Sequence, residues 1–432
     1  MPRTQWRTLQ DPTHAPTRQQ LDPLSVRRTS GCQTGDRPQW TDRLRWTERA
    51  GDPPDSTATW SIAVALRAFS PPTPLIGAPS GSSKLLPPIA SWFRSKRLVP
   101  TSDIGVDLGT ANTLVCVKGD GVVLSEPSVV AVERSTREVM SVGLDAKRML
   151  GRTPDRIQAV RPLRDGVIAD VDITEVMLRH FLRQVMAKRI FRVRPRVVVG
   201  VPSGITELEK RAVRSAALAA GANEVHMVAE PMAAAIGVGL PVETPRGNMV
   251  IDIGGGTTEI AVIALYGIVA DTSIRVGGDE LDKAIVSHVR KNYNLLIGEP
   301  TAETIKMQIG SATPSDDERD MEVKGRDLVS GIPKMVVIRS EEVRECIQEA
   351  LSSIIDAVRS ALEITPPELA SDIVDYGIVM TGGGALIRGL DKLIALETAL
   401  PIHVDEDPMT CVVRGAGCIL EDVAKYRPVL IS

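Results

Sequence analysis

The sequence lacks the features that mark three common kinds of protein. It has no uninterrupted apolar run of about 18 residues, so no segment is predicted to span a membrane as a helix. Its net charge is −3 rather than strongly positive, which argues against nucleic acid as a partner. The five cysteines form no CxxC pair or metal-ligand spacing, so we expect them to be reduced, as in a cytoplasmic protein.

The first 100 residues differ in composition from the rest of the chain. All five tryptophans and 14 of the 30 prolines lie there, and lysine occurs only twice. Without sustained apolar periodicity, residues 1–100 are predicted to be a disordered extension, or a leader translated ahead of the true start. Within it, Trp92 and Phe93 stand among basic residues at 89–100. This mixture suits an anchor on a membrane surface, with a sticky linker as the alternative.

The stretch IGVDLGTANTLVCVKG reads as two strands joined by a tight turn. Apolar residues lead to Asp107, and then Gly109, Thr110, Ala111 and Asn112 turn the chain. An ordinary hairpin would explain this composition. A phosphate-binding turn would explain it too, because glycine lets backbone N–H groups face an anion. In that case the carboxylate at the strand end could hold the water ligands of a Mg²⁺ ion.

A second stretch, NMVIDIGGGTTEIAVIALYG, repeats this plan. Its strand leads to Asp252, and the next strand starts at Glu259 after a glycine-rich turn. Each copy continues into one further strand, GVVLSEPSVVAVE in the first and GIVADTSIRVGG in the second. We interpret the pair as an internal duplication whose two hairpins clamp a triphosphate, with Mg²⁺ held through water by both strand-end carboxylates. The residues of the second turn are Gly254, Gly255, Gly256 and Thr257.

Two further segments are candidates for contact with a nucleoside. In GIVMTGGGALIRGL an apolar strand meets a glycine cluster before an expected helix, without the GK[ST] or GxGxxG signatures of other nucleotide sites. TAETIKMQIGSA reads as an exposed helix start. There Glu303 and Lys306 could reach a ribose or adenine, or simply form a charge pair one turn apart.

The helices between these motifs are predicted to serve only the fold, whereas one segment among them is a candidate for membrane contact. Thr206 and Glu209 are spaced as a capping box, and an apolar stripe in the earlier segment DITEVMLRHFLRQVMAKRI predicts a core-packed helix. The exception is the segment 188–196, where Ile190 and Phe191 stand among basic residues. This tip suits contact with anionic lipids, and a partly buried turn is the alternative.

Taken together, the two Asp–Gly hairpins and the third glycine cluster resemble the superfamily of actin and heat-shock chaperone ATPases. DLGTANT, EPSVVA, RPLRDGVIAD, EPMAAAIG, DIGGGTTE and MTGGGALIRGL resemble more closely the MreB family of bacterial actin-like proteins. The resemblance implies an α/β, duplicated actin-like (ribonuclease H-like) ATPase fold, with two halves around a nucleotide cleft and small inserted subdomains. The expected parts are the extension 1–100, a first half at 101–245, a second half at 246–425 and a tail at 426–432.

The resemblance also implies roles for individual residues in binding and hydrolysing ATP. Glu230, in VAEPMAAA, matches the family's catalytic glutamate, which would orient the attacking water, with help from Thr257. Taken without the family, Glu230 is an ordinary acid at a helix start before Pro231. Both glycine turns would contact the phosphates. The residues that would border the nucleoside are Glu303, Thr304, Ile305 and Lys306, and Gly383, Gly384, Ala385 and Leu386.

For the whole chain, the resemblance implies a cytoskeletal ATPase. It would polymerise head to tail into filaments on the inner face of the cell membrane, contact anionic lipids, and organise cell-wall synthesis with wall-synthesis and elongation proteins. One alternative is a chaperone-type ATPase, which would need a substrate domain that the sequence does not show. The other is a small-molecule kinase, for which Asp165 or Asp170 could act as a base.

Overall fold

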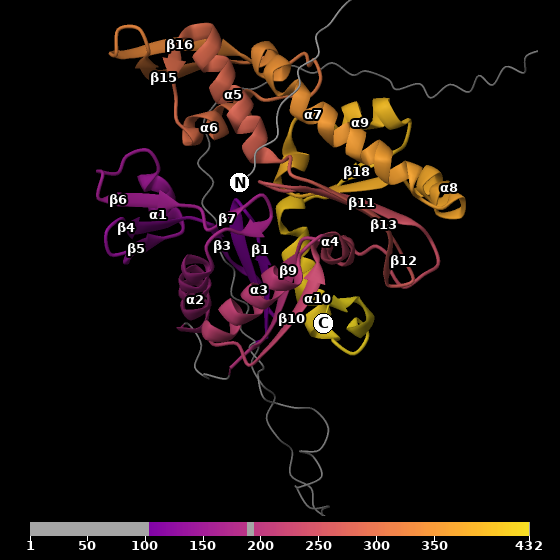
Figure 1. Cartoon of the computed structure of the whole chain (residues 1–432). Helices are drawn as coiled ribbons and strands as arrows, with labels where there is room; N and C mark the ends of the chain where they lie inside the picture. The colour runs from indigo at the N-terminus through magenta and orange to yellow at the C-terminus, as the bar shows by residue number, and fades with distance from the viewer. Residues whose placement is uncertain (1–102, 188–193, 432) are drawn as a thin grey trace, which may run out of the picture. The chain divides into compact units, whose positions relative to one another are not determined.

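The structure is a computed structural model that describes residues 103–187 and 194–431 (Figure 1). Within these ranges no helix is long and apolar enough to cross a membrane. Several sequence-based predictions lie outside the described residues: those for 1–100, Trp92, Phe93, Ile190 and Phe191.

The first half of the fold is built on a six-stranded sheet with the strand order β19-β10-β9-β1-β2-β3. Its strands are β1 (Ile104–Leu108), β2 (Asn112–Val117), β3 (Gly121–Pro127), β9 (Arg196–Val201), β10 (Glu224–Ala229) and β19 (Leu430–Ile431). β1 to β3 form an antiparallel meander, as the sequence predicts for the first two, and β9 and β10 run parallel to β1. The last strand pairs with the edge of β10, which the predicted tail at 426–432 does not anticipate.

Four helices accompany this sheet. They are α2 (Val171–Ala187), α3 (Glu207–Ala219), α4 (Glu230–Val238) and α10 (Cys411–Glu421). α2 buries its apolar stripe as predicted, with Met177 and Phe181 almost fully enclosed. The predicted capping box of α3 is confirmed, since the Glu209 N–H donates to the Thr206 hydroxyl and the Thr206 N–H donates to the Glu209 carboxylate.

A smaller sheet is inserted between β3 and β9. It consists of β4 (Val130–Glu133), β5 (Val139–Val142) and β6 (Ile157–Val160), with helix α1 (Leu144–Met149) beside it. The prediction of a single strand over GVVLSEPSVVAVE is therefore wrong, because β3 and β4 belong to different sheets. The reason lies at Ser128 between them, whose fully buried hydroxyl bonds the Gly109 carbonyl and the Thr113 hydroxyl and so turns the chain.

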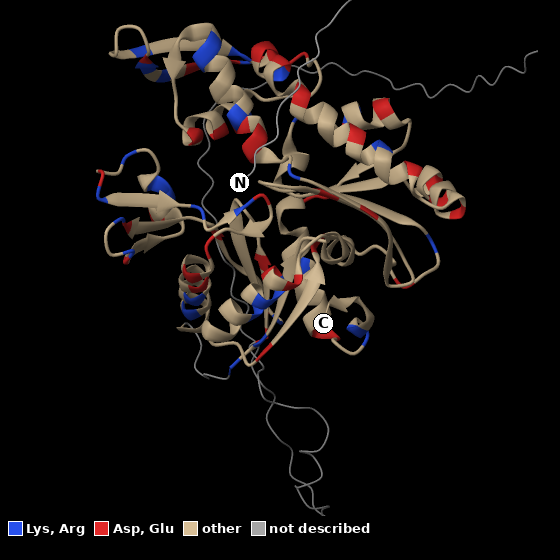
Figure 2. Ribbon diagram, viewed as in Figure 1, with Lys and Arg blue, Asp and Glu red and all other residues tan. Residues whose placement is uncertain are grey.

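The motif RPLRDGVIAD forms a two-residue hairpin of β7 (Leu163–Arg164) and β8 (Val167–Ile168). Asp165 and Gly166 both have positive φ, 51° and 75°, as the mirror-image hairpin turns require. Asp–Gly is a sequence that favours this turn. In Figure 2 basic and acidic segments both lie around β7, and acidic segments lie at the start of α5.

The second half repeats the plan on a five-stranded sheet with the order β13-β12-β11-β17-β18. Its strands are β11 (Asn248–Ile253), β12 (Thr258–Ala264), β13 (Gly267–Ile274), β17 (Ile378–Thr381) and β18 (Ile402–Val404). In each half an antiparallel hairpin lies beside a later parallel strand. Asp107 lies opposite Leu114 and Gly200, while Asp252 lies opposite Glu259 and Thr381. The two aspartates hold equivalent places, as a duplication predicts.

The remaining elements cover or extend this second sheet. They are α5 (Gly278–Tyr293), β14 (Leu295–Leu296), α6 (Glu299–Ile309), β15 (Asp320–Asp327), β16 (Pro333–Arg339), α7 (Ser340–Glu363), α8 (Pro367–Tyr376), α9 (Leu390–Thr398) and the short 3₁₀ turns η2 (Gly383–Leu386) and η3 (Pro408–Thr410). A further 3₁₀ turn, η4 (Arg427–Val429), leads into β19 of the first sheet. β14, β15 and β16 form a separate three-stranded sheet. Figure 1 shows the long helix α7 running past α5 toward α8.

A shared apolar core joins the two halves through α4 and α10. The core draws on both helices and on β11 and β12 of the second sheet. The helices approach so closely that a Cβ atom on Gly237 would lie 2.0 Å from the Cys411 carbonyl oxygen, and one on Gly415 would lie 1.8 Å from that of Ala233. Only glycine fits at both positions, so this helix pair fixes the two sheets to each other.

Candidate nucleotide site

The first glycine turn, residues 109–111, joins β1 to β2. A Cβ atom on Gly109 would lie 2.7 Å from the Asn112 carbonyl oxygen, so glycine is required there. Ser128 holds the turn from behind: its hydroxyl donates to the Gly109 carbonyl at 2.7 Å and its N–H to the Ala111 carbonyl at 3.0 Å. The carbonyls of the turn are thus engaged on the protein side, which leaves the N–H groups to face the other way.

The second glycine turn, residues 254–257, joins β11 to β12 and is held by the start of α5. The Gly278 N–H donates to the Gly254 carbonyl at 3.0 Å, and the Asp279 N–H to the Gly255 carbonyl at 2.7 Å. Again the carbonyls are engaged. Across the described part of the chain, no acceptor takes a hydrogen bond from the N–H of Ala111, Gly255 or Gly256. Free N–H groups on consecutive turn residues are the usual donors to a phosphate.

The structure brings the two turns face to face. A Cβ atom on Gly255 would lie 2.6 Å from the Ala111 Cβ, and one on Gly256 would lie 3.0 Å from the Thr110 hydroxyl oxygen. The β7–β8 hairpin completes the contact, because the Gly166 N–H donates to the Thr110 hydroxyl at 3.2 Å. Glycine at positions 255 and 256 therefore permits the approach that a clamp on a phosphate chain needs.

Four acidic side chains gather beside the turns. Burial and, to a smaller extent, the nearby Asp252 carboxylate raise the pKa of Asp107 to about 8. Burial also raises the pKa of Asp252 to about 6, although the Thr381 hydroxyl donates to its carboxylate at 2.9 Å and opposes the shift. The pKa of Glu230 is raised well above its usual value by burial and by the carboxylates of Asp107, Asp252 and Glu259. Carboxylates that repel one another in this way favour a bound cation.

These residues fit a magnesium ion held through its water ligands. Among the described residues, no group of three or more His, Cys, Asp or Glu side chains is placed to hold a metal ion directly. Asp107 and Asp252 instead offer oxygen acceptors from equivalent strand ends on two sheets. Mg²⁺ prefers oxygen ligands and keeps several waters, so two carboxylates that reach those waters suit it.

The position of Glu230 is compatible with both interpretations made from the sequence, an acid at a helix start and a catalytic glutamate. It is the first residue of α4, followed by Pro231, and so it is an acid at a helix N-terminus. It also lies within the influence of Asp107 and Asp252, which a helix-capping acid alone would not require. Its place beside the acidic group makes it a candidate to orient a water molecule near the phosphates.

Glu259 is a member of the acidic group for which the sequence analysis predicted no role. It is 1% exposed, and it accepts hydrogen bonds from the Ser273 hydroxyl at 2.6 Å and the Ser203 N–H at 3.4 Å. The sequence feature that could have identified Glu259 is its position in an apolar strand. A glutamate in a fully buried strand opposite Asp252 needs a polar partner.

The segment 303–306 on α6 reaches the site through one residue. Lys306 donates to the Gly278 carbonyl at 2.8 Å and pairs with Asp282 at 2.9 Å, at the start of the helix that holds the second turn. Glu303 pairs with Lys147 of α1 at 2.8 Å, so the alternative charge pair between Glu303 and Lys306 does not form. The other two side chains point elsewhere: the Thr304 hydroxyl bonds the Pro300 carbonyl, and Ile305 is buried in the core.

The third glycine cluster lies directly against β11. A Cβ atom on Gly382, whose φ is 80°, would lie 2.4 Å from the Ile253 carbonyl oxygen and 2.6 Å from an Asp252 carboxylate oxygen. Gly384 packs on the Ile253 side chain in the same way. In η2, Ala385 is buried and Leu386 is exposed, while Gly383 has open space around it. Of the four predicted residues, Gly383 and Leu386 are free to meet a ligand with their outward faces.

The two aspartates of the hairpin motif have different surroundings. Asp170 accepts a hydrogen bond from the Ile173 N–H at 3.1 Å and pairs with Arg137, so it caps α2. Asp165 is exposed in the turn of the β7–β8 hairpin. Asp165 lies next to the second turn, since a Cβ atom on Gly256 would lie 3.0 Å from the Asp165 backbone nitrogen, whereas Asp170 is engaged at the start of α2.

The chain is similar to proteins that determine cell shape. The family model described as MreB/Mbl protein matches residues 101–428. Over 336 residues the chain is 56% identical to the cell shape-determining protein MreB of Escherichia coli, covering 77% of this chain and 97% of that protein. It is 47% identical over 323 residues to the cell shape-determining protein Mbl of Bacillus subtilis, covering 75% and 97%.

Solved structures of a related protein carry nucleotides. The crystal structure of MreB5 of Spiroplasma citri bound to ADP has a TM-score of 0.71 and 42% identity, covering 74% of this chain and 97% of that one. The same protein bound to AMPPNP gives a TM-score of 0.70 and 41% identity, with coverage of 74% and 96%. The predicted duplicated actin-like fold is confirmed by this likeness and by the two matching sheets. The chain belongs to the MreB/Mbl family.

Proposed function

We propose that this chain binds ATP between its two glycine turns, hydrolyses it, and assembles into filaments that determine cell shape. The observation that carries the proposal is the pair of opposed turns with unengaged N–H groups above four clustered carboxylates. The names of its relatives support the cell-shape role, and the ADP and AMPPNP held by MreB5 of Spiroplasma citri support a nucleotide at this site.

Each group of residues would have its own role in binding or hydrolysing ATP. N–H groups of residues 110–111 and 255–257 hold the phosphate chain, and Gly383 and Leu386 border the nucleoside. Asp107 and Asp252 hold Mg²⁺ through water, and the ion would neutralise charge that develops on the phosphates. Glu230 orients the attacking water, and its raised pKa falls when a cation enters beside it. Thr257, buried at the end of the second turn, helps Glu230 to position that water.

Assembly would follow from nucleotide-dependent contacts between copies of the chain. A head-to-tail contact that does not close into a ring gives an open polymer. We further propose that these filaments lie on the inner face of the cell membrane, against anionic lipids, and organise cell-wall synthesis with wall-synthesis proteins. The basis for the lipid contact is the sequence around Ile190 and Phe191, where an apolar pair stands among basic residues.

The test combines phosphate release with sedimentation on anionic liposomes, using the full chain with ATP or ADP. Glu230→Ala should lower phosphate release about 100-fold or more while nucleotide binding persists, because a positioned carboxylate contributes at least that much to such steps. Glu138→Ala removes an exposed glutamate and serves as the matched control. Electron micrographs of the pellets should show ATP-dependent filaments on lipid.

Two results would count against this proposal. Equal phosphate release by the Glu230→Ala and Glu138→Ala variants would remove the role of Glu230. A monomer that turns over ATP only when a small acceptor is added would contradict the filament model and favour a kinase.

A further inference from the structure

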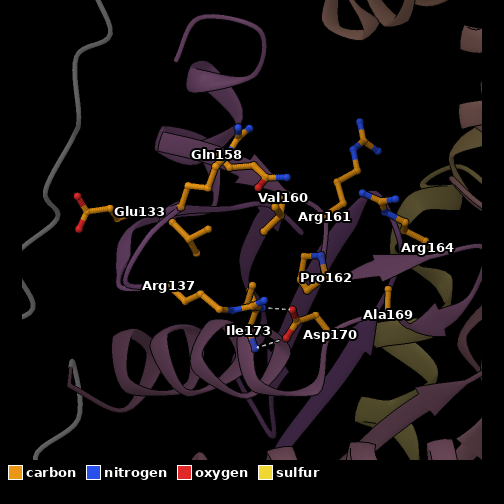
Figure 3. Close-up of a pocket in the computed structure, with 12 residues that line it drawn as sticks. Glu133, Arg137, Gln158, Val160, Arg161, Pro162, Arg164, Ala169, Asp170 and Ile173 are labelled. Atoms are coloured by element: carbon orange, nitrogen blue, oxygen red, sulfur yellow. Dashed lines mark hydrogen bonds and ion pairs between the residues drawn. The ribbon is translucent and has the colours of Figure 1, made fainter. Parts of the chain in front are cut away.

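A pocket of about 360 Å³ lies in the first half of the fold, apart from the glycine turns. It opens between the small sheet of β4 and β6, the β7–β8 hairpin and the start of α2 (Figure 3). This volume is within the range of small-molecule sites. Apolar side chains form part of its wall, among them Val132, Val160, Pro162 and Ile173.

The lining is basic, with four arginines against two carboxylates, Glu133 and Asp170. Two of the arginines are committed: Arg137 reaches across to Asp170, as Figure 3 shows, and Arg161 bonds Asp279 at 3.1 Å. The other two, Arg134 and Arg164, are exposed, and neither forms an ion pair with any side chain in the ranges 103–187 and 194–431. In addition, the Arg161 Nε–H is buried without an acceptor among those residues.

Unpaired guanidinium groups around a partly apolar pocket select a particular kind of ligand. A guanidinium donates two parallel hydrogen bonds to a carboxylate or a phosphate, and these bonds are stronger than neutral ones. The apolar wall at Val160 and Pro162 suits a short carbon skeleton. The chemistry therefore fits a small organic anion that bears a phosphate or a carboxylate group.

The same residues connect the pocket to both glycine turns. Arg164 directly precedes the hairpin turn, in which the Gly166 N–H bonds the Thr110 hydroxyl of the first glycine turn. Gly166 also packs on Thr257, since a Cβ atom there would lie 2.9 Å from the Thr257 methyl carbon.

A second route runs through Arg161, which bonds the Asp279 side chain while the Asp279 N–H holds the Gly255 carbonyl. A ligand that draws Arg161 or Arg164 inward would therefore act on groups that contact both turns.

We propose that this pocket is a second ligand site, which binds a small phosphorylated or carboxylated compound and changes the affinity of the cleft for nucleotide. Binding at the pocket is independent of the proposed ATPase function, whereas the coupling rests on it. Because coupling is reciprocal, nucleotide should change the affinity for the anion by the same factor.

The test measures binding of two probes, glycerol 3-phosphate and succinate, by calorimetry on the full chain saturated with ADP. Glycerol 3-phosphate tests whether the pocket binds a phosphate group, and succinate tests whether it binds a carboxylate group. We expect a dissociation constant of about 1 mM or below for at least one probe. Arg134→Ala with Arg164→Ala should weaken that binding about tenfold or more, because two charge-assisted contacts are lost. Arg211→Ala with Arg290→Ala removes two exposed arginines elsewhere and should leave it unchanged.

The outcomes separate the parts of the proposal. No saturable binding of either probe, or equal affinity in both double variants, would overturn the site. If the probe binds but the affinity for ADP stays the same with and without it, the site stands and the coupling is wrong. A chain that fails to bind ADP would contradict the proposed function, and the probes would still test the pocket. Circular dichroism melting curves confirm that both double variants are folded.

Discussion

The two glycine turns occupy equivalent places in the duplicated fold, yet different parts of the chain hold them. The first turn has one required glycine and is held by the hydroxyl and N–H of Ser128, which lies 19 residues after Gly109, directly beyond β3. The second turn has three glycines in a row and is held by backbone N–H groups at the start of α5. In both turns N–H groups remain without an acceptor among the described residues, and the segment after the third strand holds the carbonyls; a serine hydroxyl contributes to the first turn but only backbone N–H groups to the second.

The strand-end carboxylates differ in the same way. Asp252 receives a hydrogen bond from Thr381, which limits the rise of its pKa to about 6. At the equivalent place beside Asp107 stands Gly200, which has no side chain to donate, and the pKa of Asp107 reaches about 8. One site of the pair is thus charged at neutral pH, and the other becomes charged when a cation arrives.

The largest effect is expected where the turns meet. Gly255→Ala places a methyl group 2.6 Å from the Ala111 Cβ, which forces the two turns apart. Nucleotide affinity should fall about 10- to 100-fold, since several charge-assisted contacts would be misplaced. Gly204→Ala is the matched control, because a Cβ at that position meets no atom within 4 Å. Fluorescence titration with a labelled nucleotide measures both, and unchanged affinity in Gly255→Ala would show that the turns do not need to approach.

The next effect concerns pH and separates the two carboxylates. An acid whose pKa is raised by folding binds its proton more tightly in the folded state. It therefore costs stability as the pH rises from its unfolded to its folded pKa. The pH range over which this loss of stability occurs ends at about pH 6 for Asp252, whereas for Asp107 it extends to about pH 8.

Melting curves without nucleotide test this difference between pH 6 and 8. The loss of stability with rising pH, at most about 1.4 kcal/mol per pH unit for one proton, should become shallower in Asp107→Asn but persist in Asp252→Asn. Glu230 is present in both variants and contributes to both curves. The same slope in the two variants would refute the assigned difference.

A smaller effect is expected behind the first turn. Ser128→Ala removes the hydroxyl that bonds the Gly109 carbonyl and the Thr113 hydroxyl, and it leaves buried polar groups unpaired. The free energy of unfolding should fall by about 1–3 kcal/mol. Urea denaturation measures the change, with Ser353→Ala at an exposed position of α7 as control. If both variants denature alike, Ser128 does not support the turn.

The smallest effect is expected for the ion pair between Lys147 and Glu303, which links α1 of the first half to α6 of the second. Both side chains are about a quarter exposed, so the pair should contribute no more than about 1 kcal/mol, and less in high salt. Lys147→Met should weaken nucleotide binding by less than about fivefold. Lys283→Met, which breaks a pair within α5, is the control. A large loss would instead indicate that Lys147 touches the nucleotide.

Much of this arrangement could be predicted because its signals are local. Asp107 and Asp252 each stand before glycine in an apolar run, and that pattern predicted both hairpins and their equivalence. The capping box of α3 has the same origin, since Thr206 and Glu209 are three residues apart.

Other features depend on contacts between distant segments. No local pattern pairs Lys147 with Glu303, so the sequence offered only the wrong partner, Lys306, one turn away. The division of GVVLSEPSVVAVE into two strands depends on Ser128 meeting Gly109 and Thr113. The Asp165–Gly166 hairpin was not predicted, although Asp–Gly is a sequence that favours such a turn, and its contact with Thr110 has no local signal.

The close contact of α4 with α10 has a consequence for how the chain is made. The first sheet owes its edge strand β19 and a covering helix, α10, to residues that follow every strand of the second sheet along the chain and are synthesised after them. Domains usually fold as units in the order in which they leave the ribosome. Here the first sheet cannot be completed in that order: its edge at β10 and the face that α10 covers remain open until α10 and β19 have been synthesised.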